Sequence, residues 1–153
     1  VRRASTAIWG WPSTDRFVKK LEKETSPKYY FMDTGLLGLM LMDCSSAQLE
    51  NLVAIELIRR YGRENVFYFE KNVEIDFYVP EEKLAIQVSL QVLDQIDTRE
   101  REIGAFVKLK NFIGDATCLL ITNSEEEELD YEGVHVSVVP VWKWLLQNRK
   151  QDI

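Results

Sequence analysis

The 153-residue chain is long enough for one domain with a hydrophobic core, and its 46% hydrophobic and 29% charged residues exclude a wholly disordered protein. Its longest apolar run, Gly35–Met42, is far shorter than the roughly 20 residues that span a bilayer, so no membrane partner is expected. The net charge of −6 comes largely from one glutamate run, Glu125–Glu128. The remaining residues still lack the basic excess of a generic nucleic-acid-binding protein.

Cysteine and histidine are too scarce for several kinds of site. Two cysteines and one histidine argue against a disulfide framework, a zinc site and histidine-dependent hydrolysis. No apolar segment typical of a secretory signal follows Val1-Arg2-Arg3. Both observations favour a cytoplasmic protein. His135 is expected to be structural or solvent-facing, and Cys118 is expected to be a small core residue.

The N-terminal region shows the least regular pattern. Residues 1–27 are predicted to be a linker or a remnant of an upstream region, with a short helix at Asp15–Glu24, and residues 28–153 are predicted to form the domain. Pro27 ends the first part. A strand is expected at Lys28–Met32, followed by a short apolar helix or turn at Leu36–Met42.

Clearer patterns begin at Ser45. Apolar residues at helical spacing predict a helix from Ser45 to Gly62. An aromatic-rich strand is expected at Val66–Glu70. Alternating apolar and polar residues then predict two half-buried strands, Val73–Val79 and Leu84–Leu90, joined by a turn. This part of the chain is therefore a helix followed by three strands.

The second half continues with helices and strands. A second amphipathic helix is expected at Asp97–Gly114, and the apolar segment Thr117–Thr122 is typical of a strand buried on both faces. The run Glu125–Glu128 is expected to be a solvated loop. A further strand at Val134–Val139 precedes a final helix starting at Pro140. The order of elements predicts an α/β fold with one mixed central sheet flanked by helices.

Two groups of residues are candidates for contacts with a partner. Arg59, Arg60 and Arg63 form the densest basic cluster, for which phosphate contact and plain solvation both stay open. In the final helix, one of Trp142 and Trp144 is expected in the core, and the other could face a partner.

The predicted hairpin gathers polar residues. With the turn centred between Glu81 and Glu82, Asp76 is expected opposite Gln87, and Glu74 opposite Ser89. Residues directly opposite each other on paired strands have Cβ atoms about 4.5–5.5 Å apart. These four side chains are therefore predicted to form a compact polar patch opposite the apolar stripe. The alternative is that this face simply meets water.

Glu50 argues against a purely solvated patch. It precedes Val53, Ala54 and Leu57 by three, four and seven residues, which places its carboxylate on the apolar side of the first helix. Glu56, in contrast, has arginines at i+3 and i+4 with which to form ordinary surface ion pairs. A carboxylate on an apolar face is costly unless it is paired or binds a cation. An acidic pair facing the same space would suit Mg²⁺, which prefers oxygen ligands.

At these positions the chain resembles the C-terminal domain, of unknown function, in a family of bacterial and archaeal AAA-superfamily ATPases. That domain itself resembles the PD-(D/E)XK nuclease fold. The resemblance covers about Lys28 to Leu146 and rests on segments separated along the chain: Lys28–Leu36, Leu49–Leu57, Glu74–Phe77, Ile86–Ser89, Thr98–Ile103 and Val139–Leu146. It implies a restriction-endonuclease-like mixed sheet flanked by helices. It also implies, as partner, an upstream ATPase with a nucleotide-binding domain and a winged-helix segment. This sequence contains no Gly-x-x-x-x-Gly-Lys-Ser/Thr motif, so it is not expected to hold a P-loop nucleotide by itself.

The resemblance also assigns roles to single residues. In nuclease-competent relatives, a helix Glu, a strand Asp and the Glu of a Glu-x-Lys motif hold Mg²⁺, and the Lys positions the attacking water. By this correspondence, the catalytic positions of this chain are Glu50, Asp76, Gln87 and Ser89, and Glu50 and Asp76 are the metal ligands. Gln87 and Ser89 replace the Glu and Lys of the motif. Gln87 carries no charge, and Ser89 cannot stabilise a developing negative charge as lysine would.

Substitute groups for the lost motif are present in the sequence. Glu74 could serve as a third metal ligand, because it lies two residues from Asp76 on the same face. A cation could come from the next helix, which carries Arg99, Arg101 and Lys108.

Three functions therefore stay open. The favoured one is a catalytically degenerate nuclease-fold accessory module of an AAA-type ATPase, acting in nucleic-acid (DNA or RNA) or partner binding. The second is an active Mg²⁺-dependent endonuclease with a migrated catalytic residue, and the third is a structural oligomerisation module. On this interpretation the chain is not expected to be an enzyme by itself.

Overall fold

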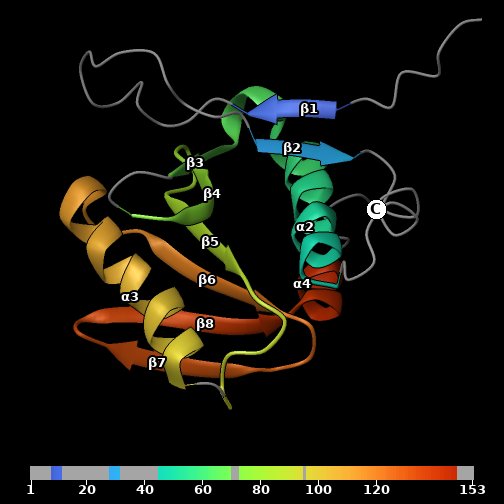
Figure 1. The fold of residues 1–153 in the computed structure, drawn as a ribbon. Helices are drawn as coiled ribbons and strands as arrows, with labels where there is room; N and C mark the ends of the chain where they lie inside the picture. Colours follow the sequence, from blue (N-terminus) through green and yellow to red (C-terminus); the bar gives the residue numbers. More distant parts are fainter. Residues whose placement is uncertain (1–7, 12–27, 32–44, 70–72, 95, 148–153) are drawn as a thin grey trace, which may run out of the picture.

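A computed structural model describes residues 8–11, 28–31, 45–69, 73–94 and 96–147 (Figure 1). Its centre is a six-stranded mixed sheet in the order β3-β4-β5-β6-β8-β7. Strands β3, β4 and β5 are antiparallel, β5, β6 and β8 are parallel, and β7 is antiparallel to β8. The strands are β3 (Phe67–Phe69), β4 (Ile75–Val79), β5 (Leu84–Val88), β6 (Thr117–Thr122), β7 (Glu127–Tyr131) and β8 (Val134–Pro140).

Helices cover both faces of this sheet (Figure 1). On one face, α2 (Ser45–Tyr61) and α4 (Val141–Gln147) pack against the sheet in a cluster that contains Leu57, Phe77 and Trp144. On the other face, α3 (Ile96–Ile113) packs in a second cluster that contains Phe106 and Tyr78. A short helix, η2 (Arg63–Asn65), follows α2. The predicted α/β architecture with a mixed sheet between helices is confirmed.

A separate two-stranded ribbon lies beside α2 (Figure 1). It consists of β1 (Ile8–Trp11) and β2 (Lys28–Phe31), paired antiparallel. The strand expected after Pro27 is thus present, whereas β1 lies in the segment that showed no regular pattern. The helices expected at Asp15–Glu24 and Leu36–Met42 fall outside the described residues. No helix of the described part of the chain is both long and apolar enough to cross a membrane.

The β4–β5 hairpin has the predicted register. Phe77 pairs with Ile86, Tyr78 with Ala85, and Val79 with Leu84. The alternative that one face meets water is wrong, because α3 covers the face that carries Tyr78 and Ala85. Both faces of the hairpin are therefore part of the core.

A β-bulge in β4 interrupts the simple alternation that the sequence suggested. Phe67 pairs with Tyr78, but Phe69 pairs with Ile75, so that β4 contains one more residue than β3 over this stretch. As a result Ile75 and Tyr78 enter the same cluster under α3, while Phe77 enters the cluster under α2. The expectation that Ile75 and Phe77 share a face is wrong. A bulge redirects side chains locally, and here it lies at Asp76.

The acidic run is exposed at Glu126–Glu128, as expected, but it is not simply a loop. Glu127 and Glu128 begin β7, which the sequence analysis missed. The Glu125 carboxylate accepts hydrogen bonds from the backbone N–H groups of Val92 (2.6 Å) and Leu93 (3.1 Å). Thr122 fixes Glu125 in turn, because its hydroxyl bonds both the N–H and the C=O of that residue. The run therefore joins the segment after β5 to the segment after β6.

Replacing Glu125 by alanine is expected to lower the free energy of unfolding by about 1.5–3 kcal/mol, because two backbone donors lose a charged acceptor. Glu127→Ala in the same run is the control. Its side chain is exposed, and a change within about 0.5 kcal/mol is expected there. Urea unfolding of both variants gives the comparison, and equal effects would contradict the role assigned to Glu125.

Candidate nuclease-like site

The structure brings three of the predicted site residues to one end of the β4–β5 hairpin. Asp76 lies near the start of β4, Gln87 lies near the end of β5, and antiparallel pairing places these ends together. Glu50 lies on α2, the helix that covers this part of the sheet. The helix acid, the strand acid and the Gln of the altered motif therefore come from three neighbouring elements.

Gln87 is a buried structural residue, with 4% of its surface exposed. Its Oε1 accepts a hydrogen bond from the N–H of Asp76 (2.8 Å), and its Nε2 donates to the C=O of Glu74 (3.0 Å). The backbone pairing of β4 and β5 ends at Phe77 and Ile86. The Gln87 side chain continues the hydrogen bonding between the two strands past this last pair. Both ends of the Gln87 amide are used for holding the hairpin together.

Asp76 also supports the hairpin. Its Oδ2 accepts a hydrogen bond from the N–H of Val88 (2.9 Å). The Gln87 side chain bonds the Asp76 backbone, and the Asp76 side chain bonds the β5 backbone, so the two bridge the strands reciprocally. Asp76 lies in the bulged part of β4.

Glu50 is hydrogen-bonded to a tyrosine that the sequence analysis did not single out. The hydroxyl of Tyr30, on β2, donates to Glu50 Oε1 at 2.6 Å. Burial raises the pKa of the Tyr30 phenol, and the negative charges of Glu50 and Asp76 raise that pKa further. The phenol therefore stays protonated, and its hydroxyl remains a donor beside both acids.

Ser89 and Glu74 do not form the predicted pair in the ladder. Ser89 leaves the hairpin, because its N–H donates to Ile121 of β6 (3.0 Å). Its hydroxyl donates to the C=O of Gln91 (3.2 Å). Glu74 is exposed just before β4. Ser89, at the position of the lysine in the nuclease motif, therefore bonds β6 through its backbone and the loop after β5 through its hydroxyl.

The helix on the opposite face contributes an arginine. Arg101 of α3 donates to Glu102 through Nε (3.2 Å) and Nη2 (2.7 Å). The bond to Glu102 and its charge raise the pKa of the Arg101 guanidinium most, and the charges of Glu74 and Asp76 raise it further. Of the basic residues proposed on this helix, Arg101 is therefore within electrostatic reach of the hairpin acids.

These side chains do not fit a preformed Mg²⁺ site. Within the described residues, no three His, Cys, Asp or Glu side chains gather as metal ligands. Glu50 and Asp76 each accept a hydrogen bond from the protein, and the Gln87 amide is used at both ends. Mg²⁺ needs oxygen ligands that can converge on one point, and these oxygens instead hold strands and a tyrosine.

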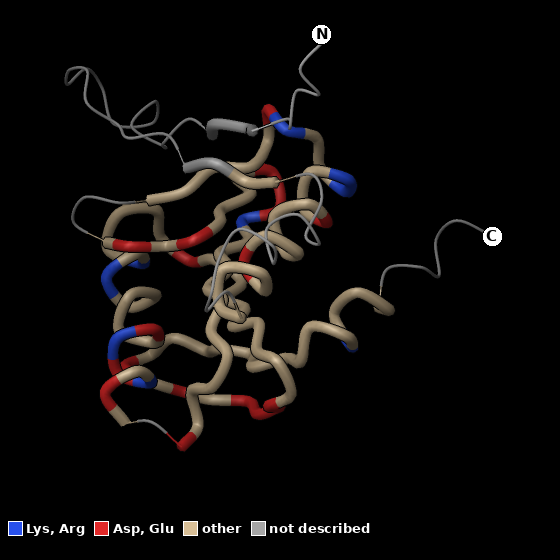
Figure 2. The backbone as a smooth tube through the Cα atoms, turned by 45° about the vertical axis from the view of Figure 1, so that its right-hand side comes forward, with Lys and Arg blue, Asp and Glu red and all other residues tan. Residues whose placement is uncertain are grey.

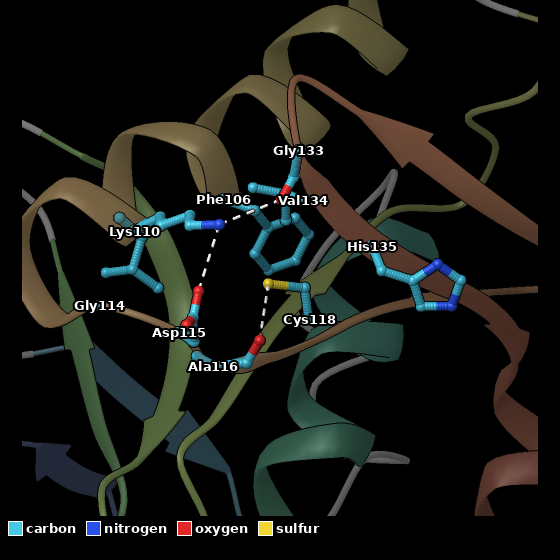
Figure 3. Close-up of a pocket in the computed structure, with 10 residues that line it drawn as sticks. Phe106, Lys110, Gly114, Asp115, Ala116, Cys118, Gly133, Val134 and His135 are labelled. Carbon is cyan, nitrogen blue, oxygen red and sulfur yellow. Dashed lines mark hydrogen bonds and ion pairs between the residues drawn. The ribbon is translucent and has the colours of Figure 1, made fainter.

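A cavity of about 230 Å³ at the other end of the sheet is no better candidate (Figure 3). The Cys118 thiol in its wall donates to the C=O of Ala116 (3.6 Å), and burial raises the pKa of that thiol to about 11. Lys110 is paired with Asp115, and His135 points away from the cavity. The His135 ring lies within 3.1 Å of both Glu128 and Asp130 on β7. Cys118 as a core residue and His135 as a solvent-facing one are confirmed.

Comparisons with protein-family models, with curated proteins and with solved structures gave no match for this chain. The resemblance to the ATPase C-terminal domain therefore stays a prediction.

Proposed function

We propose that this chain is a catalytically inactive, nuclease-fold accessory module of a larger AAA-type ATPase, and that it acts in protein-partner binding, with the upstream ATPase domain as the first candidate. The main support for the loss of catalytic activity comes from Gln87. Its side-chain amide is buried and hydrogen-bonds the backbone of Asp76 and Glu74, so it has a structural role. A mixed sheet between helices, with Glu50, Asp76 and Gln87 drawn from three adjacent elements, supports the restriction-endonuclease-like ancestry.

The charge distribution favours a protein over a nucleic acid as partner. Figure 2 shows acidic and basic positions interspersed along the described backbone, rather than one continuous basic stripe. In the densest basic cluster, Arg59 and Arg60 both bind Glu56, with N–O distances of 2.7–2.9 Å. Because nucleic-acid affinity depends on cations that neutralise phosphates, these internal ion pairs weaken the case for DNA or RNA binding.

An apolar contact surface is available on α4. Trp142 is 57% exposed and Leu146 is 54% exposed, and their spacing of four residues places both on one side of the helix. Trp144 of the same helix is buried, which confirms that one tryptophan is core and the other is exposed. Exposed aromatic and apolar side chains that lie together are typical of protein-contact surfaces.

The inactive module is tested by adding millimolar Mg²⁺ or Mn²⁺. We expect no cleavage of plasmid DNA or of DNA and RNA oligonucleotides, and a thermal midpoint that changes by less than about 1 °C, because no preformed metal site stabilises the fold. Asp76→Ala and Asp115→Ala form the matched pair. Metal-dependent cleavage that is lost in Asp76→Ala but kept in Asp115→Ala would establish the endonuclease alternative.

Binding to nucleic acid is measured separately by fluorescence anisotropy with a labelled duplex and a single strand. On the proposed function neither is bound in a salt-dependent manner, whereas tight salt-dependent binding would favour a nucleic-acid platform. Gln87→Glu combined with Ser89→Lys restores the nuclease motif. Cleavage gained by that variant would support descent from a nuclease.

A further inference from the structure

The cavity of about 230 Å³ lies between the C-terminal end of α3, the start of β6 and the β7–β8 turn (Figure 3). Its wall is mainly apolar and includes the buried side chains of Phe106, Leu109, Cys118 and Val134. An apolar cavity of about 150 Å³ is enough to hold a benzene ring. The space at this end of the sheet is therefore large enough for one small ring.

Two glycines border this space without filling it. Gly114 follows α3 with a φ of +78°, and Gly133 lies in the β7–β8 turn with a φ of +76°. Residues with a Cβ atom are strained at such φ values, so both turns favour glycine. A Cβ atom built on either residue would meet nothing within 4 Å beyond its chain neighbours. The chain thus turns twice beside the cavity and places no side chain in it at either turn.

Lys110 brings the one cation of the cavity wall. Its Nζ donates to the C=O of Gly133 (3.1 Å) and is paired with Asp115 Oδ1 (3.2 Å), and Figure 3 shows the ammonium between these two residues. An ammonium group has three N–H donors. Within the part of the chain that the structure describes, only these two groups accept from Lys110. One donor is therefore left for an oxygen of a bound molecule.

The other polar groups of the wall narrow the chemistry of a ligand. The Cys118 thiol donates to the C=O of Ala116, and burial raises the pKa of this thiol to about 11, so it does not supply a thiolate for a covalent bond. His135 points away from the cavity. Asp115 lies beside the Lys110 ammonium, and its negative charge disfavours an anion there. An uncharged oxygen acceptor suits this wall better than a carboxylate.

We propose that this cavity binds one small uncharged molecule, a ring of about benzene size that carries a single oxygen acceptor. The ring occupies the apolar space beside Phe106 and Cys118, and the oxygen accepts a hydrogen bond from Lys110 Nζ. The inference goes beyond the proposed function, because the cavity lies at the opposite end of the sheet from Glu50, Asp76 and Gln87. A bound ring contacts α3, β6 and β8 together, and it stabilises the folded chain by mass action.

The site is tested by titrating the isotope-labelled chain with acetophenone and with toluene, followed by NMR of the backbone amides. Acetophenone has a ring and a ketone oxygen, whereas toluene has the ring alone. We expect saturable shifts at Gly114 and Gly133, with a Kd on the order of 1 mM for acetophenone. Toluene is expected to bind about fivefold more weakly, because it cannot accept the hydrogen bond from Lys110. Titrations that do not saturate, or that leave both glycine amides unshifted, would overturn the site.

The role of the ammonium is tested with Lys110→Met, which removes the charge and keeps an unbranched apolar side chain. This variant is expected to bind acetophenone no more tightly than toluene, with its affinity for toluene unchanged. Lys108→Met is the matched control, because Lys108 is exposed on the same helix and does not line the cavity. Equal affinities for acetophenone in these two variants would overturn the hydrogen bond to Lys110.

The location of the ring is tested by filling the cavity. Cys118→Leu enlarges a wall residue and is expected to weaken the binding of both probes about tenfold or more, since the new side chain takes the space of the ring. Ala116→Leu fills the cavity from a second position of the wall if the first variant does not fold. Unchanged affinity in a folded filling variant would show that the probes bind elsewhere. Cleavage assays, which test the proposed function, do not depend on these results.

Discussion

Replacing Gln87 by leucine is expected to lower the free energy of unfolding by about 2–4 kcal/mol. Leucine has nearly the same size but cannot bond the N–H of Asp76 or the C=O of Glu74, and both groups are bonded by Gln87 at the hairpin. A buried backbone group left without a partner costs about 1–3 kcal/mol. Urea denaturation with circular dichroism detection measures the difference.

Gln147→Leu is the matched control for this prediction. Gln147 is an exposed residue at the end of α4, where the same substitution is expected to change stability by no more than about 0.5 kcal/mol. A Gln87→Leu variant as stable as this control would show that the amide does not hold the hairpin. The structural argument against a catalytic role for Gln87 would then be lost.

The second large effect is expected at Trp144, whose replacement by alanine should cost about 3–5 kcal/mol. The Trp144 side chain is 5% exposed and packs between α2 and the sheet. The Arg60 guanidinium lies 4.1 Å from the centre of its ring, and Arg60 Nη2 donates to the Trp144 C=O (3.1 Å). Alanine would leave a cavity and remove the ring that Arg60 covers.

Trp142 provides the control within the same helix. Because its side chain is 57% exposed, Trp142→Ala is expected to change the unfolding free energy by less than about 0.5 kcal/mol. The two variants are compared by chemical denaturation. A large loss in Trp142→Ala would mean that this tryptophan is part of the core, and the contact surface proposed on α4 would lose its main residue.

Periodicity predicted the helices and the central strands well, because burial of one helix face or of alternate strand positions leaves a direct pattern. The predicted helix Ser45–Gly62 is observed as Ser45–Tyr61, and the strand Thr117–Thr122 is observed with the same bounds. The hairpin register followed from the position of its turn, since register in a hairpin is fixed by the turn.

Features that depend on tertiary contacts were missed. The bulge at Asp76 breaks the period of two, and no local residue signals it. Strand β7 contains only one buried residue, Leu129, so its polar composition resembles a loop. Glu125 binds backbone groups that lie more than thirty positions earlier in the chain, and a charge run carries no information about such a partner.

The placement of Glu50, Asp76 and Gln87 at one end of the hairpin was predicted, but the groups to which they are hydrogen-bonded were not. Helical spacing predicted Glu50 on the apolar side of α2, where it accepts a hydrogen bond from the buried Tyr30, and strand pairing brought Asp76 and Gln87 together. The partner of Glu50 was not predicted, because Tyr30 belongs to a four-residue strand outside the sheet. Asn51 was missed for a similar reason, since its two bonds to Phe31 span twenty residues.

The acidic strand β7 also bears on how the protein behaves when concentrated. Within the described residues it has a neighbouring strand, β8, on one side only, and it carries Glu127, Glu128 and Asp130. Two molecules that joined their sheets through this border would bring like charges face to face, which disfavours growth into fibres. The charges of Glu127, Glu128 and Asp130 therefore disfavour strand pairing between molecules at this edge of the sheet.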